Sequence, residues 1–131
     1  MFMMGVLLTA CGANTKTVET VSEDTTEIVA PNDTIHADVR DGIPMVIDFY
    51  ATWCTPCKQI EPEFIEIEKE YCSKVNFLRI DIDKQPEIAK EYNVDAVPTF
   101  VLLDADDNEL YRIVGADASA LRERVKELAN Y

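Results

Sequence analysis

The chain has 131 residues, of which 47% are hydrophobic, and its formal net charge is -13. That length provides one domain and a tail, and that apolar fraction is sufficient for a single core. The acidity argues against nucleic acid or an anionic membrane surface as a partner, because like charges repel. The sequence contains no run of about 18 apolar residues, which excludes a hydrophobic transmembrane helix.

Residues 1–10 are almost entirely apolar and end in the four residues Leu8-Thr9-Ala10-Cys11. An apolar run followed by small residues is typical of an export segment with its cleavage site. The four residues resemble the lipobox of bacterial lipoproteins, which implies a signal peptide over 1–10 and a lipidated Cys11. The implied location is the periplasmic side of a bacterial membrane. Because no Lys or Arg precedes Cys11, a hydrophobic N-terminus with an incidental cysteine stays open as the alternative.

Residues 11–27 form the next segment, which is rich in Thr, Ser and acidic residues after the cysteine. Such a composition cannot bury enough apolar surface to offset the entropy of ordering the chain. We therefore expect a flexible tether here and a folded domain over residues 28–131.

The first half of that domain alternates strand and helix patterns. A weak strand is expected at residues 28–30 and a short helix at 33–39. Met45–Tyr50 is an apolar run broken by one acid, which is typical of a strand covered on both faces. The helical pattern over Pro56–Tyr71 includes Pro62, which we expect to kink the helix.

The second half continues the alternation and ends in a hairpin and a helix. We expect a strand over 75–82, a short helix over 86–92, hairpin strands over 99–103 and 110–114, and a last helix capped by Asp117 or Ser119. In the hairpin turn, Asn108 is the residue expected to accept a left-handed conformation. This order predicts an α/β fold in which a mixed central sheet is flanked by helices on both faces.

Cys54 and Cys57 form a C-x-x-C pair between a buried strand and the start of a helix. Only a thiolate attacks a disulfide, and the N-terminus of a helix favours an anion. Cys54, expected to be the more exposed, is therefore predicted as the nucleophile, and Cys57, three residues later, as the resolving thiol. Pro56 suits the first helical turn, where no N–H partner is required.

A C-x-x-C pair is also half of a structural zinc site, which needs four ligands. The other candidates are Cys11, His36 and Cys72, which are scattered along the chain. We therefore predict no metal and no other cofactor.

Residues 46–58 read VIDFYATWCTPCK and resemble the thioredoxin active-site signature V-D-F-W-A-x-W-C-G-P-C-K. The resemblance covers about residues 28–131 and continues at Pro62, residues 80–83, 92–94 and 97–99, and Gly115. It implies the thioredoxin fold and thiol–disulfide oxidoreductase activity.

The resemblance also implies roles for individual residues. Asp48 would be the buried acid that relays a proton for Cys57, and desolvation should raise its pKa. A carboxylate satisfied at a strand edge is the alternative for Asp48. Pro98 would follow a cis peptide bond and, with Val97, present backbone groups to an extended substrate chain.

Trp53 would cover the site and contact partners, unless it simply packs in the core. Thr55 and Pro56 would also contact the substrate. The chain departs from the family at Thr55, where glycine is usual, and at Arg79, where lysine is usual.

These observations predict a monomeric enzyme that reduces disulfides in exported proteins and is itself reduced by a thiol electron donor in the membrane. Two alternatives stay open: an oxidase or isomerase of the same fold, and a non-catalytic module that only binds clients. Pro56 and Asp48 favour the reductase over the oxidase, because a strong oxidant gains from an over-stabilised thiolate.

Overall fold

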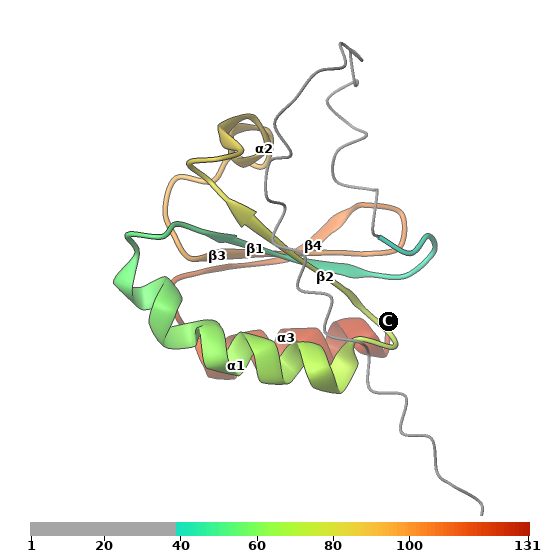
Figure 1. The fold of residues 1–131 in the computed structure, drawn as a ribbon. Helices are drawn as coiled ribbons and strands as arrows, with labels where there is room; N and C mark the ends of the chain where they lie inside the picture. Colours follow the sequence, from blue (N-terminus) through green and yellow to red (C-terminus); the bar gives the residue numbers. More distant parts are fainter. Residues whose placement is uncertain (1–38) are drawn as a thin grey trace, which may run out of the picture.

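The computed structural model describes residues 39–131. The predicted signal peptide, Cys11, the tether, the strand at 28–30 and all but the last residue of the helix at 33–39 lie outside this range. The described elements, in chain order, are β1 (Met45–Tyr50), α1 (Thr55–Tyr71), β2 (Asn76–Asp81), α2 (Pro86–Glu91), β3 (Thr99–Leu103), β4 (Glu109–Val114) and α3 (Ala118–Ala129) (Figure 1).

The strands form one mixed sheet in the order β2-β1-β3-β4. β1 pairs in parallel with β2 and antiparallel with β3, and β3 pairs antiparallel with β4. Helix α1 makes the crossover that the parallel β1–β2 pair requires. Because β1 has a partner on each side, a residue in its middle cannot lie at a sheet edge.

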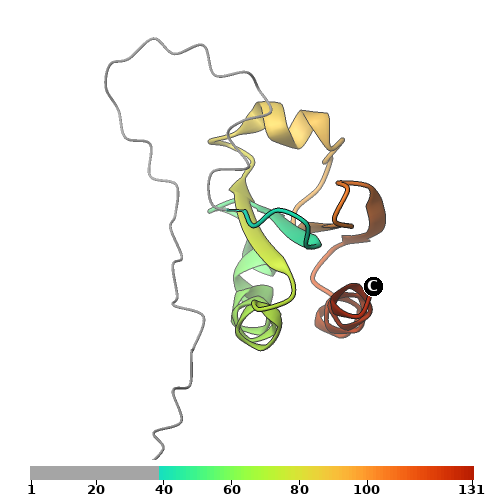
Figure 2. The same ribbon diagram turned by 90° about the vertical axis from the view of Figure 1, so that its right-hand side faces the viewer.

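Helices cover both faces of the sheet, as the sequence predicts. α1 and α3 lie side by side on one face, and α2 lies on the other (Figures 1 and 2). Val46, Phe64 and Leu121 belong to the core cluster beneath α1 and α3, whereas Ile47 and Ile88 belong to the cluster beneath α2. Successive residues of β1 therefore enter opposite clusters, which explains its unbroken apolar run.

The ends predicted for the strands and helices that lie within residues 39–131 are correct to within one residue, and one local detail differs. In the hairpin turn Asp107, not Asn108, has the left-handed backbone, with φ of 63°. The Asn108 side-chain amide instead donates to the Asp104 carboxylate at 3.0 Å. At α3 the prediction of a cap at Asp117 or Ser119 is confirmed for Asp117, whose carboxylate accepts from the Ala120 N–H at 2.9 Å.

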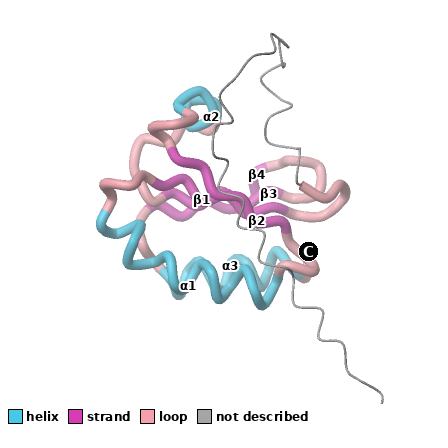
Figure 3. The backbone as a smooth tube through the Cα atoms, viewed as in Figure 1, coloured by secondary structure: helices cyan, strands magenta, loops and turns pink. Residues whose placement is uncertain are grey.

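Figure 3 shows the loops at the carboxyl end of β1 and before β3 at one end of the sheet. α1 starts at this end and runs without interruption through Pro62 to Tyr71. The C-x-x-C pair therefore lies between a central strand and the longest helix of the described residues.

Candidate active site

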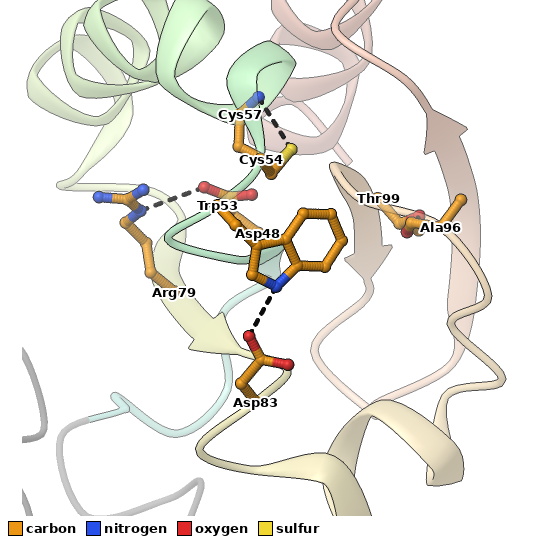
Figure 4. The surroundings of a disulfide bond; sticks show 8 residues. All are labelled: Asp48, Trp53, Cys54, Cys57, Arg79, Asp83, Ala96 and Thr99. Atoms are coloured by element: carbon orange, nitrogen blue, oxygen red, sulfur yellow. Dashed lines mark hydrogen bonds and ion pairs between the residues drawn. A yellow bond between two sulfur atoms is a disulfide. The ribbon is translucent and has the colours of Figure 1, made fainter.

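Cys54 and Cys57 are joined by a disulfide bond with a Cα–Cα distance of 5.3 Å. Cys54 is the N-cap residue of α1, with an extended backbone, and the Cys57 N–H donates to its Sγ at 3.2 Å (Figure 4). The sequence-based prediction that the pair opens a helix is confirmed.

This cap geometry has a direct consequence for the reduced protein. The N–H groups of the first helical turn have no partner within the helix, and the helix dipole places positive potential at this end. An N–H directed at Sγ of Cys54 stabilises a thiolate more than a thiol, because the thiolate is the stronger acceptor. Cys54 is thus the sulfur that the fold favours as an anion.

The expectation that Cys54 is the more exposed cysteine is wrong for this disulfide form. Cys54 is 3% exposed and Cys57 is 4% exposed, and both pack with Ala51 and Val97. Exposure therefore does not distinguish the two sulfurs. Their positions do, because Cys54 caps the helix and Cys57 lies within its first turn.

Asp48 lies in the middle of β1 and is 3% exposed. Its Oδ2 accepts from Nε of Arg79 at 3.1 Å, while its buried Oδ1 has no hydrogen-bond partner among residues 39–131. Burial raises the pKa of Asp48 to about 6, although the charge and hydrogen bond of Arg79 act to lower it. The strand-edge alternative is wrong, since β1 is internal, and the raised pKa agrees with the sequence-based prediction.

Trp53 is 65% exposed, so the alternative of core packing is wrong. Its indole Nε1 donates to Oδ2 of Asp83 at 2.8 Å, which fixes the ring beside the cysteines (Figure 4). Asp83 was not predicted as a site residue. The only signal for it in the sequence is its place in the IDID stretch at residues 80–83 that matches the family pattern.

The Val97–Pro98 loop reaches the disulfide from the start of β3, and its peptide bond is cis, as the resemblance implied. Val97 packs against the cysteine cluster. Two hydrogen bonds hold the loop: the Gly115 N–H donates to the Pro98 carbonyl at 2.8 Å, and Thr99 Oγ1 donates to the Ala96 carbonyl at 2.7 Å. Thr99 is a second residue that the sequence did not single out.

Thr55 and Pro56 are exposed at the start of α1, next to the buried cysteines. The structure thus brings together all the predicted site residues that it describes: Asp48, Trp53, Cys54, Thr55, Pro56, Cys57, Val97 and Pro98. Arg79, noted only as a departure from the family, also belongs to this site through its ion pair with Asp48.

A metal site at these cysteines finds no support within the described range. Cys72 caps the far end of α1, which places it roughly 22 Å along the helix from Cys57. Residues 39–131 contain no group of three or more His, Cys, Asp or Glu side chains placed to hold a metal ion.

The helices in this same range are all too short or too polar to cross a bilayer.

The thioredoxin family profile matches residues 26–127, which is most of the chain. The chain belongs to the thioredoxin family. With its Cys54–Cys57 pair in place, this thioredoxin is a thiol–disulfide oxidoreductase.

Known thioredoxins from several organisms are similar to the chain. The mitochondrial thioredoxin-3 of Saccharomyces cerevisiae is 42% identical over 90 residues, which cover 69% of each chain. Thioredoxin-1 of Drosophila melanogaster is 38% identical over 91 residues, covering 70% of this chain and 84% of its own. The crystal structure of oxidised mitochondrial thioredoxin 3 from Saccharomyces cerevisiae superposes with a TM-score of 0.62 at 43% identity. The superposition covers 68% of this chain and 81% of the yeast chain.

Proposed function

We propose that this thioredoxin reduces disulfide bonds in other proteins, with Cys54 as the attacking thiolate and Cys57 as the resolving thiol. The observation that carries the proposal is the Cys57 N–H directed at Sγ of Cys54 at the N-terminus of α1. This contact favours the anion at the one sulfur that must attack.

The reaction proceeds in two exchanges from the reduced protein. The Cys54 thiolate attacks one sulfur of the substrate disulfide, that bond breaks, and the departing substrate sulfur takes up a proton. Cys57 then loses its proton to Asp48 and attacks Sγ of Cys54. The mixed disulfide breaks, the second substrate sulfur leaves as a thiolate and is protonated, and the Cys54–Cys57 disulfide forms. Two electrons pass to the substrate, the solvent supplies one proton, and Cys57 supplies the other, which Asp48 releases again after the exchange.

Asp48 suits the second step because its pKa lies close to neutral pH. With a pKa of about 6 the carboxylate is mostly ionised at pH 7, yet it binds a proton more readily than an ordinary aspartate. Its Oδ1 has no hydrogen-bond partner among the described residues, so this oxygen is available to accept the proton of Cys57.

Substrate binding is assigned to the surface around the sulfurs. Trp53 supplies an exposed aromatic ring, Thr55 and Pro56 border the disulfide, and Val97, which precedes the cis bond to Pro98, presents backbone groups. An extended segment of the substrate would pair with these backbone groups, as a strand adds to a sheet edge. The proposed partner is therefore a protein with an accessible disulfide.

The test is reduction of insulin disulfides by the reduced wild-type protein, compared with variants in which Cys54 or Cys57 is serine.

Disulfide donation, the reverse reaction, uses the same atoms. The reduction potential separates the two directions, because a potential near that of strong disulfide donors, roughly -120 mV, would contradict the reductase proposal.

We further propose that the protein is exported and held by a lipid at Cys11 on the periplasmic side of a bacterial membrane. The support is the order of the sequence, in which an apolar run over 1–10 ends in Leu-Thr-Ala before the cysteine. Its substrates would then be exported proteins with disulfides, and its electrons would come from a thiol donor in the membrane.

Cys11→Ala is expected to move the protein from the membrane fraction to the soluble fraction. Each buried methylene of an acyl chain contributes about 0.8 kcal/mol, so loss of the chains removes the anchor. Cell fractionation with immunoblotting measures the shift, and mass spectrometry of the N-terminal peptide detects the lipid. Thr15→Ala, which leaves the four-residue pattern intact, is the control. A Cys11→Ala protein that stayed in the membrane would place the anchor elsewhere.

A further inference from the structure

The guanidinium of Arg79 joins two carboxylates that lie on different elements. Its Nε donates to Oδ2 of Asp48 on β1 at 3.1 Å, and its NH1 donates to Oε1 of Glu61 on α1 at 2.9 Å. The same group lies over the Tyr50 ring, 4.3 Å from its centroid. Arg79 is therefore fixed from three sides, which a single ion pair at the surface would not achieve.

The two carboxylates differ in burial and in how Arg79 meets them. The side chain of Asp48 is 4% exposed, whereas that of Glu61 is 41% exposed. Nε of Arg79 donates to Oδ2 of Asp48 and NH1 donates to Glu61, so Arg79 binds one oxygen of Asp48 and not both. Oδ2 is occupied, and Oδ1 stays without a hydrogen-bond partner in the described part of the chain. Figure 4 shows the Asp48 carboxylate between Arg79 and the cysteine pair.

A free Arg79 would interact differently with Asp48. Arginine and a carboxylate favour a bidentate pair, in which two nitrogens bind both oxygens. If Glu61 released NH1, the guanidinium could turn until NH2, which lies on the same edge as Nε–H, met Oδ1 as well. That contact would occupy the oxygen that must accept a proton and would strengthen the pull of the positive charge on the carboxylate.

We propose that Glu61 is a positioning residue of the resolving step, holding Arg79 so that it binds only Oδ2 of Asp48 and leaves Oδ1 open to the proton of Cys57. The inference rests on the proposed function, because it concerns the exchange in which Cys57 displaces the substrate. In that step the Cys57 S–H bond breaks, its proton passes to Oδ1, and its sulfur bonds to Sγ of Cys54 as the substrate sulfur leaves.

The charged and titratable groups around this network come from three elements. They are Asp48 and Tyr50 on β1, Cys57, Glu61 and Glu68 on α1, and Arg79 and Asp81 on β2. On the other side of β1, the residue of β3 opposite Asp48 is Phe100, which carries no charge. Among the described residues, Arg79 forms ion pairs with two acids, Asp48 and Glu61.

Glu61→Gln removes the negative charge but keeps a side-chain oxygen that can accept from NH1, and Glu61→Ala removes both. The matched control is Glu63→Gln, which takes the same charge from α1 at a residue that pairs with Arg122 instead of Arg79. The measurement is the pH dependence of mixed-disulfide resolution by the full-length protein, with insulin as the substrate. The rate of the first exchange and the melting temperature are recorded alongside.

In Glu61→Gln we expect the pH at which the resolution rate is half-maximal to fall by roughly half a unit. The rate of resolution at pH 7 should also be lower than in the wild type. The shift should be larger in Glu61→Ala, absent in Glu63→Gln and partly restored in Glu61→Asp, while the first exchange keeps its rate. Equal profiles for Glu61→Gln and Glu63→Gln would overturn the positioning role. A wild-type protein that reduces no insulin, with a Cys57→Ser variant that traps no mixed disulfide, would overturn the proposed function instead.

Discussion

Cys54→Ser is expected to lower insulin reduction by at least about a thousandfold, because a serine hydroxyl is not ionised at neutral pH and forms no exchangeable bond to sulfur. The cap contact can survive, since the Cys57 N–H can donate to a hydroxyl oxygen as it does to Sγ. The loss would thus come from chemistry and not from unfolding. Turbidity of reduced insulin measures the rate, and circular dichroism confirms the fold.

Cys57→Ser is the matched control for this prediction. It keeps Cys54 and the backbone N–H of residue 57, so the first exchange should proceed and stop at a mixed disulfide with the substrate. Non-reducing gels should show an adduct that a small thiol releases, and peptide mapping should place it on Cys54. Activity of Cys54→Ser equal to wild type would end the enzymatic interpretation. An adduct formed through Cys57 in Cys54→Ser would reverse the two roles.

Asp48→Asn should slow the resolving exchange by about a hundredfold at pH 7, because the proton of Cys57 then lacks its acceptor. The first exchange should be unaffected. The pH dependence of resolution near pH 6 should also disappear, since it follows the Asp48 carboxylate. Rapid-mixing measurements that follow Trp53 fluorescence separate the two exchanges. Unchanged resolution with unchanged pH dependence would remove Asp48 from the mechanism.

The same substitution should stabilise the fold above neutral pH. The pKa of Asp48 is about 6 in the fold and about 4 in the unfolded chain, so the unfolded chain loses its proton first as pH rises. Ionisation of Asp48 therefore lowers the free energy of unfolding. This loss of stability is absent below about pH 4, increases between about pH 4 and pH 6, and is constant at higher pH. Asp48→Asn should therefore gain about 2–3 kcal/mol at pH 8 and little at pH 4 in urea unfolding. A gain that does not depend on pH would contradict the raised pKa.

The sequence predicts those parts of the fold whose signals are local. The apolar run of β1, the helical spacing of α1 and the caps of the helices depend on residues within a few positions of one another. The cis bond before Pro98 is different, because most X–Pro bonds in folded proteins are trans. That prediction came only from the resemblance to a known family.

Contacts between distant segments account for what the sequence did not predict. Trp53 meets Asp83, and Arg79 meets Glu61, across gaps in the chain that no periodic pattern spans. The equal burial of the two cysteines has the same origin. Val97, which packs on the cysteine cluster, comes from a loop far along the chain, so the exposure of Cys54 is not set by its helix alone.

The most direct measurement is the ionisation of Cys54 in the reduced Cys57→Ser variant, which retains the N–H of residue 57. The rate of alkylation by iodoacetamide is followed against pH, with mass spectrometry assigning the label to Cys54. We predict a pKa clearly below the value of about 8.5 for a free cysteine. A pKa at or above that value would contradict the central claim that the start of α1 makes Cys54 the attacking thiolate.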